Sequence, residues 1–438
     1  CNSCHILLRG NIPTKEDQEM KSTRFILIVL ALCAFTGAKA QTLAEVIATG
    51  LENNYNLKIA RNEEAISANN ATAANAGYLP TVNATAGYSG TVDTGNGGQL
   101  GHGIQAGVNA EWTLFDGFKI QATYSKLQEL KRQGATRTRL TIEDYVATLT
   151  AEYYNLIQQK IRMRNLNNAV KLSKERLRIV LERYSIGSAS RLDLQQAQVD
   201  FNADSAQSLK QHELMATSRI RLYELMAVRD MQTPLSLRDS VIEVDTSLTH
   251  DHLLDNTMAL NAELLNRRHD IRLAELDYKA TMSRDFPYIK LNAGYNYQHT
   301  IGGDGRGGVD FGVKVGYNLF DGKRTSQRRN ARLDIENADL ARLQLEQTLR
   351  ADLADLWQAY KNNLRLLSLE RENLITAQEN HYIAHERYML GDLSGIEMRE
   401  AQQSLLDAEE RILVAEYNTK LCEISLHQIS GEIMKYME

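Results

Sequence analysis

An apolar residue recurs at every seventh position through a long stretch of the first half of this chain. The row starts at Ile142 and continues through Leu149, Leu156, Met163, Val170, Leu177 and Tyr184. A companion row holds Val146, Tyr153 and Leu181. A heptad pattern sustained in this way is typical of a coiled coil. If residues 117–184 form one helix, it is on the order of 100 Å long, far beyond the helices of ordinary globular domains.

A second, less strict seam follows in the other half of the chain, and both seams stop at matching turns. The second seam runs through Leu353, Tyr360, Leu367, Leu374 and Tyr388. The turns are RYSIGSASRLDLQQAQ at 183–198 and RYMLGDLSGIEMREAQ at 387–402. Gly187 and Gly391 allow the helices to end, and Ser190 and Ser394 are suitable caps for the next ones. We therefore predict two long antiparallel helical hairpins, over residues 117–229 and 322–438.

Two segments with a period of two interrupt the helical pattern at residues 80–115 and 287–320. The apolar positions of the first are Val82, Ala84, Ala86, Tyr88, Ile104, Ala106, Val108, Ala110, Trp112 and Leu114. Those of the second are Ile289, Leu291, Ala293, Tyr295, Tyr297, Phe311, Val313, Val315, Tyr317 and Leu319. Each segment reads as a β-hairpin with a glycine-rich connection. Such strands are long enough to cross the ~25 Å apolar band of a membrane barrel. The alternative is a soluble sandwich, but the chain holds no further strands to form a second sheet.

The same four letters, Leu-Phe-Asp-Gly, end both segments, at 114–117 and 319–322. We expect Phe115 and Phe320 to cover the rim of the sheet. Asp116-Gly117 and Asp321-Gly322 are expected to turn the chain into a helix, whose N-terminus favours an acidic residue. Two unrelated turns would not explain why the flanking patterns also match.

These pairs of motifs indicate an internal duplication. A weaker correspondence aligns NNYNLKIA at 53–60 with RRHDIRLA at 267–274. We expect a first structural repeat over residues 41–229, a less regular equatorial connector over 230–262, and a second repeat over 263–438.

The first forty residues contain an export signal and one competing motif. Residues 20–40 combine Lys21 and Arg24, an apolar core and Ala-Lys-Ala, the pattern of a secretory signal peptide. The CNSCH motif at residues 1–5 has c-type haem spacing, but it precedes the signal and would be lost on cleavage. We read residues 1–19 as an over-extended start and expect a mature chain from Gln41. A lipidated start at Cys33 stays open.

After cleavage a single cysteine remains, Cys422, so no internal disulfide can form and the fold depends on packing. No further apolar run has the length of a membrane-spanning helix. Any return to a membrane must therefore use the strands.

Composition and motifs exclude several classes of function. A formal charge of −5 is unlike a nucleic-acid surface, which clusters Lys and Arg. Neither a nucleophile elbow nor a phosphate-binding loop occurs, and GGDGRGG reads as a hairpin tip. We expect no enzyme activity, cofactor or metal. His381 with His385, and His250-Asp251-His252, are the sets that leave metal binding open.

Four strands cannot close a barrel, and an open sheet edge in lipid is costly, so the chain must assemble with copies of itself. The chain resembles the TolC-type outer membrane efflux protein family. The features that carry the resemblance are the two Leu-Phe-Asp-Gly junctions, the two Tyr-x-x-Gly turns, the duplicated hairpins, and Pro80 and Pro287 before the strands. The resemblance covers residues 41–438. It implies a homotrimer, in which twelve strands form one outer-membrane barrel and the helical hairpins form a hollow periplasmic α-barrel.

The resemblance also implies a function and its partners. Such proteins are exit ducts of tripartite efflux or type I secretion systems in Gram-negative cells, and they work with a periplasmic adaptor and an inner-membrane transporter. The expected docking tips are Gly187, Ser188, Ser190, Gly391 and Ser394. The transported substrate, whether drug, metal or protein, stays open, and so does the alternative of a periplasmic structural coiled coil without a pore.

The family's periplasmic aperture is built from acidic residues shortly after the second turn. Alignment on Tyr388 and Gly391 places Glu397 and Glu400 there, three residues apart and hence on one helical face. In a trimer they would form two carboxylate rings that favour cations. The same alignment puts Asp193 opposite Tyr388, a pair that helps to hold the closed state. Leu393 replaces an arginine found in some members, which weakens that expectation. Alternatively, Glu397 and Glu400 are ordinary solvated carboxylates.

Overall fold

The computed structural model describes residues 41–437 except 94–98, 233–234 and 302–303. The signal peptide at 20–40, the start at 1–19, Cys33 and the CNSCH motif all lie outside the described residues. The first half contains α2 (Leu43–Asn53), α3 (Tyr55–Asn70), α4 (Ala73–Ala76), β1 (Thr81–Asp93), β2 (Gln99–Asp116), α5 (Lys119–Ser185) and α6 (Arg191–Leu225). The second contains α7 (His250–Leu260), α8 (Ala262–Met282), η1 (Ser283–Asp285), β3 (Tyr288–Thr300), β4 (Gly305–Gly316), α9 (Arg324–Leu390), α10 (Gly395–Ile429) and η2 (Ile433–Met437).

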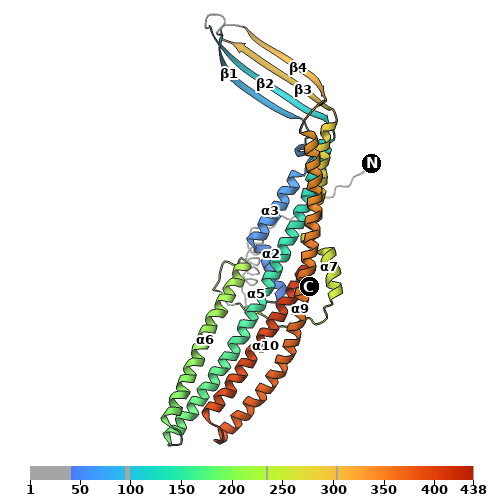
Figure 1. The fold of residues 1–438 in the computed structure, drawn as a ribbon. Coiled ribbons are helices and arrows are strands. Elements are labelled where there is room, and N and C mark those ends of the chain that lie inside the picture. The colour runs from blue at the N-terminus through green and yellow to red at the C-terminus, as the bar shows by residue number, and fades with distance from the viewer. Residues whose placement is uncertain (1–40, 94–98, 233–234, 302–303, 438) are drawn as a thin grey trace, which may run out of the picture.

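The molecule is elongated, with the sheet at one end and helical hairpins at the other (Figure 1). Helices α5 and α9 have 67 residues each, and each runs from the sheet to a distant turn. Helices α6 and α10, with 35 residues each, return from these turns to the middle of the molecule. At a rise of about 1.5 Å per residue the long helices span roughly 100 Å. The prediction of two long helical hairpins with four strands is confirmed.

The four strands form one antiparallel sheet in the order β1-β2-β3-β4. Its register aligns the apolar positions across the sheet, so that one row reads Ala84, Val108, Tyr295, Val309. The neighbouring row on the other face reads Asn83, Asn109, Gly294, Asp310. The predicted alternation is thus confirmed. The sheet has one apolar face and one polar face, and Val309 on the apolar face is 75% exposed.

Both strand ends near the helices depart from the expected alternation. A β-bulge between Thr113 and Phe115 leaves Leu114 out of the register and sets Phe115 opposite Ile289. Phe115 therefore takes the place on the apolar face that the sequence assigned to Leu114. Strand β4 ends at Gly316, so Tyr317 and Leu319 lie beyond the sheet. A bulge inserts one extra residue into a strand. A prediction based on strict two-residue alternation therefore assigns the residues after the bulge to the wrong face.

The duplication extends to small helices and their caps. Asn54 accepts hydrogen bonds from the N-terminus of α3, and its Nδ2 donates to Leu225 O at 2.9 Å. Asn261 caps α8 in the same way, and its Nδ2 donates to Ile429 O at 2.9 Å. Asn54 and Asn261 have the same spacing as Pro80 and Pro287. The alignment of 53–60 with 267–274 is therefore wrong by seven residues, a shift of one heptad that leaves the apolar pattern of a helix almost unchanged.

Residues 230–262, expected as a connector, contain helix α7, which has 11 residues like α2. Both short helices lead directly into the capping asparagines. The expected connector thus includes an element that has a counterpart in the first half.

The main apolar core lies at the middle of the molecule, where α2, the ends of α6 and α10, and η2 surround α5. Leu149 and Tyr153 of the first seam are fully buried there. Near the turn at the end of α5, the predicted heptad row is no longer the buried one. Leu181 is 53% exposed there, while Arg176 and Val180 are buried. In the second seam Leu353, Tyr360, Leu367 and Tyr388 are all buried. Over the described part of the chain, no helix is both long and apolar enough to span a membrane.

Candidate functional site

The two turns far from the sheet have the same backbone construction. Gly187 and Gly391 adopt φ values of +81° and +88°. In the first turn Ser188 N donates to Arg183 O at 2.8 Å, and in the second Asp392 N donates to Arg387 O at 2.9 Å. This left-handed closure favours glycine. An added Cβ at either glycine would meet no atom within 4 Å, so the requirement comes from the backbone conformation rather than from crowding.

A capping box starts each returning helix. Ser190 Oγ accepts from Asp193 N, and Asp193 Oδ2 accepts from Ser190 N at 2.9 Å. Ser394 and Glu397 repeat this arrangement, with Glu397 Oε2 accepting from Ser394 N at 3.0 Å. Ser190 Oγ and Ser394 Oγ also donate to these carboxylates at 2.7 Å. The hydroxyl hydrogen bonds, together with those from the backbone amides, lower the pKa values of Asp193 and Glu397. The two carboxylates are therefore structural counterparts, and each already has a local function at its helix N-terminus.

Glu400, the other expected aperture residue, is exposed one turn further along α10. Within the described residues it has no hydrogen-bond or ion-pair partner. The expected docking residues Gly187, Ser188, Ser190, Gly391 and Ser394 are all exposed as well.

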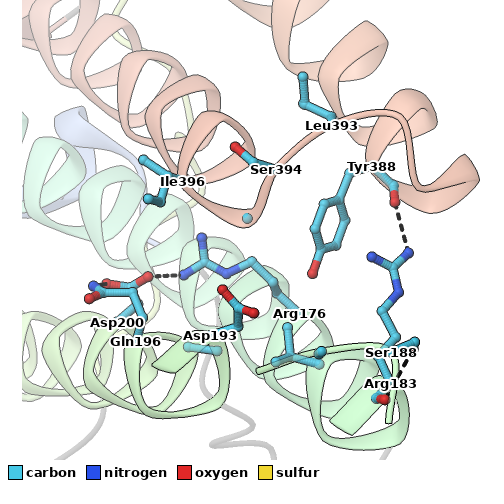
Figure 2. A pocket seen from close by; sticks show the side chains of 14 residues that line it. Arg176, Arg183, Ser188, Asp193, Gln196, Asp200, Tyr388, Leu393, Ser394 and Ile396 are labelled. Carbon is cyan, nitrogen blue, oxygen red and sulfur yellow. Dashed lines mark hydrogen bonds and ion pairs between the residues drawn. The ribbon is translucent and has the colours of Figure 1, made fainter. Parts of the chain in front are cut away.

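A cavity of about 280 Å³ separates the two turns, and Tyr388 enters it from α9 (Figure 2). Tyr388 is 3% exposed, and Arg183 both lies over its ring at 4.9 Å and donates to its carbonyl oxygen at 2.9 Å. Burial raises the pKa of Tyr388. The positive charges of Arg183 and Arg176 oppose this rise, and the Asp193 carboxylate adds to it by a smaller amount. The structure thus brings Asp193 and Tyr388 together at one cavity, although no hydrogen bond joins these two described residues. Leu393 also lines the cavity.

Two buried ion pairs beside this cavity were not anticipated from the sequence. Arg176 of α5 pairs with Asp200 of α6, and its Nε and Nη1 atoms have no partner in the described structure. Arg399 of α10 reaches across to α6 and binds both carboxylate oxygens of Asp204 at 2.7 Å. Asp204 is only 1% exposed. None of these four residues lies on a heptad row read from the sequence, so periodicity gave no signal for them. A buried charge requires a partner, and only the structure shows which residues provide it.

The repeated Leu-Phe-Asp-Gly junctions differ in detail. Asp116 Oδ1 accepts from Ile120 N at 3.0 Å, and Asp321 Oδ1 accepts from Lys323 N at 3.0 Å. The aspartates therefore bind amides near the helix starts, but the N-cap positions themselves are Phe118 and Lys323. Gly117 has a φ of +70°, whereas Gly322 is outside the left-handed region. Phe320 is 89% exposed, while Phe115 packs edge-on against Phe118.

The two histidine sets do not assemble larger clusters. The rings of His381 and His385 are 6.4 Å apart on α9, and His250 contacts the ring of Trp357. No group of three or more His, Cys, Asp or Glu side chains that could hold a metal occurs among the residues described.

A sheet with one apolar and one polar face, joined to very long helical hairpins, defines a channel subunit that contributes four strands to a membrane barrel. A family model described as outer membrane efflux protein matches residues 46–228 and 253–432. The chain belongs to this family of outer-membrane channels from Gram-negative bacteria, which have a large periplasmic helical part.

Two curated relatives span nearly the same length. The chain is 21% identical to outer membrane protein TolC of Vibrio cholerae, over 94% of this chain and 96% of that protein. It is 24% identical to toluene efflux pump outer membrane protein TtgC of Pseudomonas putida, over 89% and 82%.

Solved structures share the fold. The CusC channel superposes with a TM-score of 0.74 at 17% identity, covering 90% of this chain and 92% of that one. The CmeC outer membrane channel of Campylobacter jejuni gives 0.74 at 16% identity, covering 89% and 85%.

Proposed function

We propose that this protein is the homotrimeric exit duct of a tripartite efflux or type I secretion system. The observation that carries the proposal is the four-stranded sheet, whose edge strands β1 and β4 each pair with a single strand among the described residues. Unpaired edges in lipid are costly because no water satisfies their backbone groups. Joining β4 of one copy to β1 of the next removes every edge.

Three copies would supply twelve strands, a number within the range of outer-membrane barrels. The apolar face carries Val82, Val108 and Val313, each half exposed or more, and would face lipid. The opposite face carries Asn109, Asn296 and Asp310, which form a hydrogen-bonded row. This face would line an aqueous lumen, so the duct needs no reaction chemistry of its own.

We place the closable aperture at the two turns, with Glu397 and Glu400 as charged rings and Asp193 and Tyr388 as part of the closed arrangement. The cavity between the turns and the Asp204–Arg399 pair between α6 and α10 support this placement. Movement of one hairpin against the other would have to break that buried pair. The exposed turns would receive the periplasmic adaptor or the inner-membrane transporter.

A structural coiled coil without a pore would not explain why the sheet exposes an apolar face. In a protein confined to the periplasm, that face would be an aggregation liability.

The test measures the mass of the assembly and its ion conductance. The protein is extracted in detergent, its mass is measured by native mass spectrometry, and it is then inserted into a planar lipid bilayer. A particle of three chains that forms steady ion-conducting pores supports the duct. A protein that stays soluble without detergent and forms no pore supports the structural coiled coil instead.

A further inference from the structure

A groove of about 340 Å³ lies between α5 and α8, directly below the sheet. Phe118 and Phe286 line its end nearest the sheet, and Leu276 and Ala122 form part of its wall. Phe118 is 50% exposed and Phe286 is 45% exposed. Two large aromatic rings are thus left half open to their surroundings at the point where the strands end.

The aromatic end of this groove continues the apolar face of the sheet. Phe118 packs edge-on against Phe115 at 5.1 Å and against Phe286 at 5.5 Å. The β-bulge sets Phe115 opposite Ile289, which belongs to the apolar face. The groove therefore begins on the side of the molecule that meets lipid, at the level where outer-membrane proteins carry interfacial aromatic residues.

Phe118 is held there at a conformational cost. Its φ of +73° lies in the left-handed region, which bulky residues rarely adopt. Gly117 precedes it with a φ of +70°. In this conformation the ring contacts those of Phe115 and Phe286.

The other wall of the groove supplies positive charge. Lys279 is exposed and has no ion-pair partner among the described residues. It lies one turn before Ser283 at the end of α8, about 6 Å along the helix axis. Beyond the hydrocarbon core each leaflet has a polar layer roughly 5–8 Å thick. If the hydrocarbon core ends where the strands end, Lys279 is at the depth of the lipid headgroups. Arg272, further along the groove, pairs with Glu275.

The groove is also remote from the edges at which copies of the chain would join. In the upper helical layer α3 packs on α5, α5 packs on α8, and α8 packs on α9. Helices α5 and α8 are the two middle helices, as β2 and β3 are the two middle strands. Assembly through the outer elements leaves the groove uncovered.

We propose that this groove binds an anionic phospholipid of the periplasmic leaflet, with Lys279 on the phosphate and the acyl chain against Phe118 and Phe286. The proposal relies on the membrane location of the family and not on the substrate or partners of the duct. Bound lipid would hold the sheet and the helices in one orientation at the membrane surface.

The test is native mass spectrometry of the detergent-extracted assembly, titrated separately with phosphatidylglycerol and with phosphatidylcholine. The wild type is expected to retain phosphatidylglycerol in preference to phosphatidylcholine. Lys279→Ala should weaken phosphatidylglycerol binding on the order of tenfold, since it removes a charge-assisted contact. Lys174→Ala, at an exposed lysine far down α5, is the matched control and should change nothing.

A second variant tests the aromatic wall without threatening the fold. Phe118→Gly removes the ring but suits the positive φ, so it should fold and should weaken the binding of both lipids. Equal retention of the two lipids by the wild type would overturn the proposal, as would unchanged phosphatidylglycerol binding in Lys279→Ala. Either result would mean non-specific annular lipid only.

Discussion

The Glu397 carboxylate combines a proposed role in the charged ring of the aperture with a capping role at the N-terminus of α10. The family resemblance predicts Glu397 at the periplasmic aperture, and in the structure its carboxylate accepts hydrogen bonds from Ser394 in a capping box. Asp193 does the same in the first hairpin. A carboxylate that receives hydrogen bonds keeps its negative charge, so capping and a charged ring are compatible.

Substitutions at Glu397 can separate the two roles. Glu397→Gln should keep the capping box, because glutamine also serves at this position, but it removes the charge. Together with Glu400→Gln it should lower the cation-to-anion permeability ratio in planar bilayers without lowering thermal stability. Glu397→Ala is the control that loses the cap as well. If the double glutamine variant is as cation-selective as the wild type, both residues are solvated carboxylates and the aperture lies elsewhere.

Acidification offers a further check on the same residue. Because the hydrogen bonds from Ser394 lower the pKa of Glu397, the stabilisation from its capping box is present at neutral pH. It is lost only as the pH falls through that lowered pKa. Selectivity that depends on Glu397 should therefore persist into the acidic range in which an unperturbed glutamate is already protonated.

At the scale of elements, the two Leu-Phe-Asp-Gly junctions show how a repeated sequence can have unequal structural roles. The first lies within and just after β2, a strand that pairs on both sides, while the second follows the edge strand β4. A Cβ at Gly117 would lie 2.1 Å from Ser283 O, whereas one at Gly322 would meet its nearest atom at 3.9 Å.

This difference yields a matched pair of variants. Gly117→Ala should destabilise the protein by at least about 1–2 kcal/mol, the cost of a left-handed alanine, with a further cost from the clash with Ser283. Gly322→Ala should have little effect. The measurement is the apparent melting temperature of the detergent-extracted protein. Equal losses at the two glycines would show that both junctions are equally constrained.

At the scale of the whole molecule, the outer elements carry apolar surface that one chain leaves uncovered. In the lower helical layer α6 and α9 are the outer helices (Figure 1). A heptad row on α9, Ile375, Tyr382 and Met389, is exposed by 65%, 66% and 50%. Leu192 and Val199 on α6 form a similar pair. In the proposed trimer, these exposed apolar residues on the two outer helices would pack against neighbouring copies.

A charge in this row should weaken assembly. Tyr382→Lys is expected to shift the detergent-extracted protein from three chains towards single chains in native mass spectrometry. Asn380→Lys adds the same charge at an exposed position two residues away on a different helical face, and should leave the mass unchanged. A fully trimeric Tyr382→Lys variant would remove this row from the subunit interface.

The elements of this protein could be predicted from its sequence: two long hairpins, four strands with one apolar face, and turns closed by glycine. These follow from local rules, since periodicity and turn chemistry act within a few residues. The tertiary structure was needed for the bulge at Leu114, for the contacts of the caps Asn54 and Asn261 with Leu225 and Ile429, and for the charge pairs of Arg176 and Arg399. Each of these depends on which residue of a distant segment lies opposite, and a repeating pattern is compatible with more than one such pairing.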